Sequence, residues 1–209
     1  MTLASIVTPT MPGREDLLLK RCMPSIRAVD WPEVEHVIVS DPNPTLRKLI
    51  KQFDNVRFVE INDTWRDGSK DLSIGAVPWH IGSMMALGEY VGFVGDDDEL
   101  LPDHITRHAE ALQEFDFSVS PIQFRVRGED VQVIGDRLAC GFLDATGIMC
   151  RREALRVANW HANGEDAADW RLVRDWMERG LKGTVLTGPP TGIHNDGWMI
   201  GVSGQAYTA

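Results

Sequence analysis

The stretch that decides the fold is EYVGFVGDDDELLPDHI, residues 89–105. Its apolar run at 90–94 is typical of a buried strand, and this strand ends abruptly in four acidic residues, Asp96, Asp97, Asp98 and Glu99. Like charges this close together repel one another where they are poorly solvated, so something must compensate them. The two candidates are bulk water, as in an ordinary acidic turn, and a bound metal ion.

The residues before this stretch alternate between strand and helix patterns. Apolar strand patterns lie at 3–9, 36–40 and 56–61. Helical patterns lie between them and the stretch, at 15–29, 41–53 and 78–89, with a polar loop at 63–77. Pro24 should kink the first helix, and Asn43 can cap a second helix that starts at Pro44 and places Leu46, Leu49, Ile50 and Phe53 on one face. This order predicts an α/β fold with a Rossmann-like, mostly parallel central sheet flanked by helices.

The residues after the acidic turn are less regular. A helix is predicted to open at Leu101 and Pro102, with Ile105, His108 and Leu112 on its buried face. Strand patterns follow within 117–126, 147–151 and 183–188, and helical patterns within 152–160 and 166–180. Residues 192–209 contain four glycines and little periodicity, so we expect a mobile tail. The whole chain, 1–209, is predicted to be a single domain.

Composition narrows the class of protein. The chain has 209 residues, of which 43% are hydrophobic and 25% charged, which suits one globular domain with its own core. A net charge of −10 argues against a general polyanion-binding surface. No apolar run approaches the roughly 20 residues that span a bilayer, and the first residues lack a signal-peptide pattern, so we expect a soluble, cytoplasmic protein. Cys22, Cys140 and Cys150 are expected to be reduced core thiols.

The acidic stretch lies where α/β proteins bind ligands. In open α/β sheets, ligands sit beyond the carboxyl ends of the strands, and both Asp41 and the Asp96–Asp98 cluster follow such ends. Magnesium and manganese favour oxygen ligands, and a metal-bridged diphosphate needs only one or two protein carboxylates. Alternation would point Asp96 and Asp98 toward the same ion and turn Asp97 elsewhere. The chain has no lysine-containing phosphate loop of the G-x-x-x-x-G-K-[ST] type.

Several segments carry a resemblance to a known family. They are SIVTPTMPGREDLLLKRCMPSI, HVIVSDPNPT, IGSMMALGEYVGFVGDDDELLPDHI and TGIMCRREALRVANWHANGEDAADWRLVRDWMERG. In this order they resemble the inverting glycosyltransferases of family 2, which have the GT-A fold, over nearly the whole chain. The most specific pieces are ALGEYVGFVGDDD and GEDAADW.

The resemblance implies a role for several residues. Binding of the donor nucleotide is implied for Thr8, Pro9, Thr10, Asp41, Asp96 and Asp97. Asp96 and Asp98 would form the D-x-D pair, with Asp98 as the direct metal ligand and His194 as a further contact to the metal or diphosphate. Asp166 would be the general base that deprotonates the acceptor hydroxyl, and Glu165 and Asp169 are its alternatives.

Two departures from the family pattern affect this assignment. Trp79 and His80 stand where the family usually has Arg-Asn, and Ser40 precedes Asp41 where the family has a second acid. Plainer readings also remain open: a solvated acidic turn at 96–99, a turn-capping role for Asp41, and a simply exposed His194.

The implied function is metal-dependent, inverting transfer of a sugar from a nucleoside-diphosphate donor to an acceptor hydroxyl, with Mn²⁺ or Mg²⁺. A UDP-sugar is the first expectation for the donor. The acceptor is left open between a saccharide, a protein and a modified nucleic acid. Residues up to about 100 would form the donor half, and 101–209 the acceptor half. The alternatives are a non-catalytic sugar-nucleotide-binding module, a nucleotidyltransferase, which normally has a Gly-rich basic first loop, and a receiver-like domain.

Overall fold

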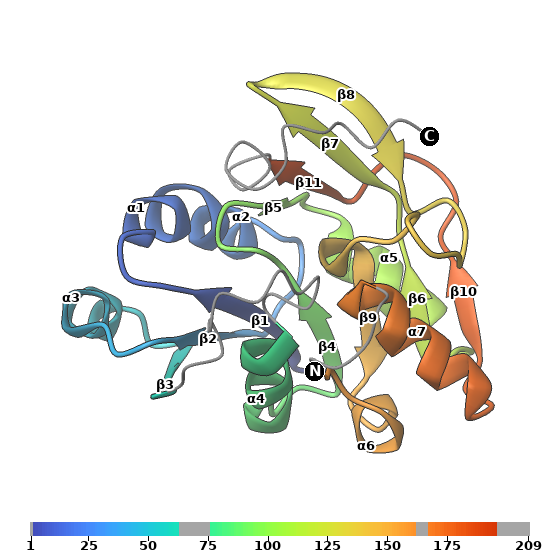
Figure 1. The fold of residues 1–209 in the computed structure, drawn as a ribbon, viewed down its shortest axis with the longest axis horizontal. Helices are drawn as coiled ribbons and strands as arrows, with labels where there is room; N and C mark the ends of the chain where they lie inside the picture. Colours follow the sequence, from blue (N-terminus) through green and yellow to red (C-terminus); the bar gives the residue numbers. More distant parts are fainter. Residues whose placement is uncertain (1, 63–75, 162–166, 196–209) are drawn as a thin grey trace.

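The computed structural model describes residues 2–62, 76–161 and 167–195, and its largest element is a seven-stranded sheet (Figure 1). The strands of this main sheet are β1 (Ala4–Thr10), β2 (Val34–Ser40), β3 (Val56–Glu60), β4 (Tyr90–Phe93), β6 (Phe117–Val119), β9 (Ile148–Arg151) and β10 (Gly183–Val185). Their order is β10-β6-β9-β4-β1-β2-β3. Only β9 runs antiparallel to its neighbours β4 and β6. The prediction of a mostly parallel central sheet is therefore confirmed.

Helices cover both faces of the main sheet. Val7 and Val39 point to one face, which is covered by α4 (Ala76–Met85), α6 (Ala154–Val157) and α7 (Ala168–Glu178). Ile6 and Ile38 point to the other face. That face is covered by a π-helical stretch (Leu18–Cys22), which follows the short α1 (Glu15–Leu17), and by α2 (Met23–Arg27), α3 (Pro44–Leu49) and α5 (His104–Ala111). The alternation of side chains along each buried strand supplies both hydrophobic layers.

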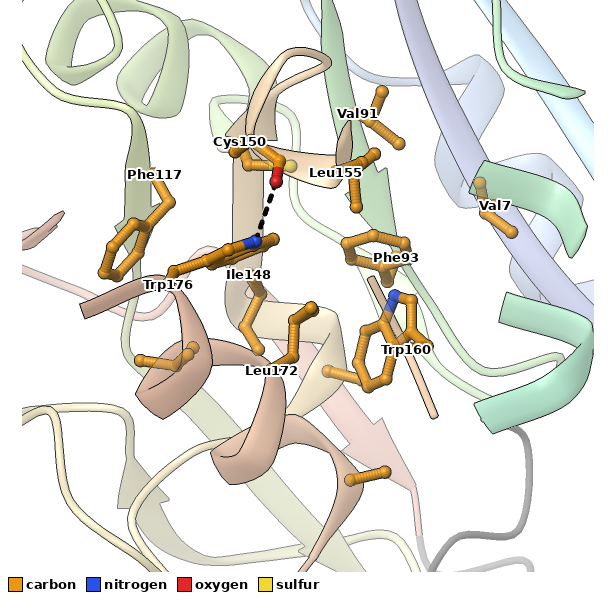
Figure 2. Close-up of a cluster of buried hydrophobic side chains, with 14 of the residues drawn as sticks. Val7, Val91, Phe93, Phe117, Ile148, Cys150, Leu155, Trp160, Leu172 and Trp176 are labelled. Atoms are coloured by element: carbon orange, nitrogen blue, oxygen red, sulfur yellow. Dashed lines mark hydrogen bonds between the residues drawn. The ribbon is translucent and has the colours of Figure 1, made fainter. Parts of the chain in front are cut away.

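Aromatic rings dominate the first of these layers (Figure 2). Trp160 meets Phe93 edge to face with ring centroids 4.8 Å apart, and Trp176 packs on Phe117 at 5.1 Å. The indole N–H of Trp176 donates to the backbone oxygen of Ala154 at 3.0 Å, which is the dashed line in Figure 2. This bond attaches α7 to α6 and satisfies the only polar atom that the buried indole carries.

The local signals near the N-terminus mostly hold. Asn43 caps α3, because its Oδ1 accepts a hydrogen bond from the Leu46 N–H at 3.0 Å, and Pro44 is the first helical residue. Leu49 departs from the prediction: it is 37% exposed and does not join the buried face. Pro24 was predicted to kink or interrupt the first helix, and the α-helix is interrupted next to it. Pro24 lies in the first turn of α2, and the adjustment before it takes the form of the π-helical stretch.

A smaller, four-stranded sheet lies at the top of the view in Figure 1. It contains β5 (Glu99–Leu100), β7 (Ile122–Val126), β8 (Glu129–Ile134) and β11 (Gly192–Asn195), in the order β5-β11-β7-β8. A 3-10 turn (Ala145–Gly147) leads into β9, and another (Ile50–Gln52) follows α3. The segment 192–195 was predicted to belong to a mobile tail, and this is wrong. It forms β11 because β7 and β5, which are distant in the sequence, supply its hydrogen bonds.

Two further observations bear on the sequence-based expectations. Within the described residues, no helix is both long and apolar enough to cross a membrane. Cys22 and Cys150 are buried as expected, whereas Cys140 is exposed, so the prediction of three core thiols is wrong for Cys140.

Candidate active site

The acidic turn between β4 and β5 is buried. Asp96, Asp97 and Asp98 are only 5%, 6% and 4% exposed. They follow β4 directly, next to the carboxyl end of β1, since Val7 of β1 pairs with Phe93 of β4. A solvated acidic turn is therefore the wrong interpretation of these three residues. Glu99 differs from them, because it is partly exposed and lies 3.9 Å from Arg21 Nε.

Arg14 compensates two of the three buried carboxylates. Its Nε lies 2.9 Å from both carboxylate oxygens of Asp96, and its Nη2 lies 2.7 Å from Asp96 Oδ1 and 2.7 Å from Asp97 Oδ2. Thr10 completes the shell by donating to Asp96 Oδ2 at 2.6 Å. The sequence suggested water or a metal ion as the partner of these negative charges, whereas the structure shows that Arg14 neutralises two of them.

Asp98 belongs to a different cluster, formed with Asp144 and His194. His194 Nδ1 lies 3.0 Å from Asp144 Oδ2 and 3.5 Å from Asp98 Oδ2. Asp98 also accepts hydrogen bonds from the Asn195 N–H at 2.9 Å and from Thr146 Oγ1 at 3.1 Å. One potential ligand atom from each of the three side chains lies within 4.8 Å of the others.

The polypeptide holds this cluster from several sides. His194 is on β11 and stacks on Phe124 of the neighbouring strand β7, with ring centroids 4.3 Å apart. Asp144 caps the 3-10 turn before β9, where its Oδ1 accepts from the Thr146 N–H at 2.9 Å. The site is thus assembled where the small sheet meets the end of β4.

Burial and mutual charge shift the ionisation of the cluster. Burial raises the pKa of Asp98 to about 7, and the negative charges of Asp144 and Asp97 act in the same direction against the charge of His194. Burial opposes protonation of His194, but Asp144 and Asp98 outweigh it and raise its pKa to about 10. Burial also works against ionisation of Asp144, yet the His194 charge lowers the pKa of this carboxyl. These opposite shifts favour an ion pair between the His194 imidazolium and the Asp144 carboxylate.

This donor set fits a divalent cation. Two carboxylates and one imidazole supply hard oxygen and nitrogen ligands of the kind that Mn²⁺ and Mg²⁺ take, and a cation would replace the proton that His194 holds. Asp98 and His194, the two predicted metal contacts, are both in this cluster.

Another carboxylate with a raised pKa lies at the start of α7. Asp169 is in the first turn of that helix and accepts from the Trp170 N–H at 2.6 Å. Burial raises the pKa of Asp169 to about 7, and the charge of Asp144 adds to this shift. Asp166, the predicted base, and Glu165 lie outside the described residues.

The remaining predicted positions line the ends of β1 and β2. Thr10 pairs with Ser40, so the half-buried Asp41 follows β2 beside the end of β1. The Thr8 side chain is buried and lies 2.8 Å from His36 Nε2, so only the backbone of Thr8 can face a ligand beyond the strand ends. His80, one of the departures from the family pattern, contacts the backbone oxygen of Trp160 through Nδ1 at 2.9 Å.

Sequence reasoning missed Arg14, Asp144, Thr146 and Asn195. Asp144 carried one usable signal, because an aspartate ahead of Ala-Thr-Gly is typical of a capped turn. Nothing local marks Arg14, whose partners are more than 80 residues away in the sequence.

Comparison with known proteins shows the family to which the chain belongs. The model of the family described as "Glycosyl transferase family 2" matches residues 5–139, which is more than half of the chain. The structure of a fragment of S. aureus TarS is similar, with a TM-score of 0.70 and 18% identity over 93% of this chain and 60% of that one. The same fragment in complex with UDP-GlcNAc gives a TM-score of 0.70 and 18% identity, over 93% of this chain and 58% of that one.

The mannosyltransferase PcManGT from Pyrobaculum calidifontis, in complex with GDP-Man and Mn²⁺, has a TM-score of 0.63 and 16% identity over 91% of this chain and 56% of that one. These likenesses confirm the GT-A fold, and this chain spans about 60% of the TarS fragment. A search of curated proteins found no match.

Proposed function

Because the chain belongs to glycosyl transferase family 2, we propose that it transfers a sugar from a nucleoside-diphosphate donor to an acceptor hydroxyl, with inversion, using Mn²⁺ or Mg²⁺. The observation that carries this proposal is the cluster of Asp98, Asp144 and His194 beside the end of β4, where open α/β sheets bind ligands. The family supports sugar transfer, and the three side chains separately support a divalent cation at the same strand end.

The residues of the site divide between the donor and the cation. Asp98, Asp144 and His194 would hold the cation, which when bound neutralises charge on the leaving diphosphate. The backbone of Thr8, Pro9 and Thr10, together with Asp41, would contact the nucleoside at the ends of β1 and β2. Asp96, the first acid of the D-x-D pair, and Asp97 would contact the donor from the acidic turn.

The general base is proposed to be Asp166, with Asp169 as the competing carboxylate. The observation in favour of Asp169 is its burial beside Asp144, which raises its pKa to about 7. A base whose pKa lies near the working pH combines a large ionised fraction with good proton affinity. Asp166→Asn and Asp169→Asn separate the two, because loss of the base abolishes turnover and leaves donor binding intact.

The donor and acceptor assignments remain proposals. TarS is known in complex with UDP-GlcNAc and PcManGT with GDP-Man, and this supports a nucleotide sugar as donor, with a UDP-sugar proposed first. We propose that residues up to about 100 bind the donor nucleoside and that residues from about 101 to 209 bind the acceptor, with Asp144 and His194 of the second part reaching the donor diphosphate only through the cation. A saccharide, a protein and a modified nucleic acid are the candidate acceptors, and the acceptor itself is not identified. The cytoplasmic location stays a prediction.

Calorimetric titration tests the proposal directly. UDP- and GDP-sugars are titrated into the protein with Mn²⁺ and then with EDTA, in wild type and in Asp98→Asn. Asp16→Asn is the matched control, since Asp16 is an exposed carboxylate on α1 whose partner is Lys20. Metal-dependent binding that Asp98→Asn loses and Asp16→Asn keeps supports the site.

Binding that ignores both the metal and Asp98 contradicts it. Donor binding without any turnover over a panel of acceptors supports the non-catalytic module, and formation of a sugar nucleotide from a sugar phosphate supports a nucleotidyltransferase.

A further inference from the structure

Arg14 places a guanidinium inside the acidic turn. Three short contacts join its Nε and Nη2 to the Asp96 carboxylate, and Nη2 reaches Asp97 at 2.7 Å as well. The Arg14 side chain is 14% exposed, so these are largely desolvated, charge-assisted interactions. Such contacts are stronger than exposed ion pairs, for which a contribution near zero is common.

The loop before α1 holds Arg14 in this position. The Arg14 N–H donates to the Met11 backbone oxygen at 3.1 Å, and the Arg14 oxygen accepts from the Leu18 N–H at 3.2 Å. Thr10, four residues earlier, binds the same Asp96 carboxylate. The β1–α1 connection therefore closes over the acidic turn from one side.

The contacts of Arg14 divide the three aspartates into two groups. Both oxygens of Asp96 are engaged by Arg14, and one of them also by Thr10, so a cation could bind there only by breaking these contacts. Asp98 instead has an oxygen 3.5 Å from His194, within the cluster that includes Asp144. A divalent cation is thereby directed to one side of the turn.

Charge gives Arg14 a second effect on the donor. Among the described residues, the group of carboxylates formed by Asp96, Asp97, Asp98 and Asp144 has ion pairs with one guanidinium, that of Arg14, and in the loaded site it would face one divalent cation as well. A diphosphate that approaches this site meets excess negative charge. Arg14 reduces that excess by one unit.

We propose that Arg14 is a positioning residue of the donor site, which fixes Asp96 and Asp97, confines the divalent cation to Asp98, Asp144 and His194, and lowers the repulsion of the donor diphosphate. This inference rests on the proposed function. It predicts opposite effects on two ligands when the guanidinium is removed. The affinity for the metal should rise, because the carboxylates of Asp96 and Asp97 become free to bind it. The affinity for the nucleotide should fall, because a positive charge near its diphosphate is lost.

The experiment compares wild type with Arg14→Met, Arg14→Lys and, as a matched control, Arg137→Met. Arg137 is an exposed arginine whose partner is Asp136. Mn²⁺ alone is titrated calorimetrically first, and UDP or GDP is then titrated in saturating Mn²⁺. Thermal melts of each variant check that it is folded.

In Arg14→Met we expect Mn²⁺ to bind several-fold more tightly, or a second equivalent of Mn²⁺ to bind. The nucleotide affinity should fall by a factor of roughly ten or more, which is the scale of one hydrogen bond to a charged group. Arg14→Lys keeps the charge without the planar fork, so its nucleotide affinity should lie between the two. Arg137→Met should match wild type in both titrations.

A parallel loss of both affinities in a folded Arg14→Met protein would assign Arg14 a merely structural role and overturn the inference, and so would two unchanged affinities. If Arg14→Met does not fold, an unchanged nucleotide affinity in Arg14→Lys overturns it. If wild-type protein binds neither nucleotide in the presence of Mn²⁺, the proposed function is contradicted, and the inference about Arg14 fails with it. This result differs from the outcomes above, which compare the variants with a wild type that does bind.

Discussion

At the scale of single residues, Asp144 controls the charge of its neighbours. Its carboxylate lies 3.0 Å from His194 Nδ1 and, together with Asp98, raises the pKa of that imidazole to about 10 against the effect of burial. Asp144→Asn removes the nearer negative charge, so we expect the pKa of His194 to fall by one unit or more in metal-free protein, about 1.4 kcal/mol per unit. An NMR titration of the histidine side chains measures this directly.

Asp130→Asn is the control for that titration, because Asp130 is an exposed carboxylate that pairs with Arg125 in the β7–β8 hairpin. An unchanged His194 titration in Asp144→Asn would mean that Asp98 alone sets the charge of the imidazole. The same variant should weaken Mn²⁺ binding, since it removes one of three potential ligands.

His104 makes stability depend on pH. It is fully buried, with Nδ1 2.8 Å from Thr191 Oγ1, and burial lowers its pKa to about 4. The unfolded histidine titrates near 6.5, so between about pH 6.5 and 4 only the unfolded chain takes up this proton. Stability is lost over that window as the pH falls, by up to about 1.4 kcal/mol per unit for this group.

His104→Gln removes this titration and isolates its contribution from those of other groups. The stability of wild type relative to the variant should therefore decrease between pH 7 and pH 5, as measured by urea unfolding at both values. A difference that stays constant over this range would show that His104 is protonated equally in the folded and unfolded states.

Functional and capping residues could be predicted from the sequence where a local pattern indicated their role. Asp96, Asp98 and Asn43 stand at strand ends or helix starts, where position alone indicates a ligand site or a cap. Arg14 and Asp144 belong to the candidate site because of contacts with segments far along the chain, and no pattern in the residues around them predicts those contacts. Asp41 and Asp166 keep their roles as predictions.

At the scale of elements, α4 packs on the main sheet without room for a side chain at Gly82. A Cβ there would lie 2.2 Å from Val7 Cγ1 and 3.1 Å from Val39 Cγ2. Gly82→Ala must therefore displace α4 or force Val7 from its rotamer, at a cost of about 1–3 kcal/mol. Urea unfolding should show this loss, although alanine favours helices by about 1 kcal/mol over glycine.

Met84→Ala is the matched control on the same helix, because Met84 is 69% exposed and should change stability little. A Gly82→Ala protein as stable as wild type would show that α4 can shift away from β1 at no cost.

Elements buried on both faces were easier to predict than elements at an edge. β1, β2 and β4 are almost entirely buried, and each contains a short apolar run that is visible in the sequence. β8 and β11 are not: five of the six residues of β8 are exposed, and β11 owes its structure to β5 and β7. The turn into β8 did carry one signal in the sequence, Gly128, because the two residues of this tight turn, Arg127 and Gly128, both adopt positive φ, which glycine does readily.

At the scale of the whole molecule, the cluster of Asp98, Asp144 and His194 joins segments that are distant along the chain. Asp98 follows β4 of the main sheet, Asp144 precedes β9, and His194 lies on β11 of the small sheet. A cation that binds all three recognises only the folded arrangement. Mn²⁺ at 100 times its dissociation constant should then add about 2.7 kcal/mol to the free energy of unfolding.

For a chain of this length, that gain corresponds to a rise in Tm of roughly 5–10 °C, measurable by differential scanning calorimetry with Mn²⁺ and with EDTA. His194→Ala removes the ligand from the small sheet, so its own Mn²⁺-induced rise should be much smaller, whereas Asp16→Asn should keep the wild-type rise. The comparison is between the rises within each protein, so a lower starting Tm in His194→Ala does not affect it. At one fixed Mn²⁺ concentration the rise depends on the dissociation constant, so an equal rise in His194→Ala would mean that the variant binds Mn²⁺ as tightly as wild type and that His194 is not a ligand.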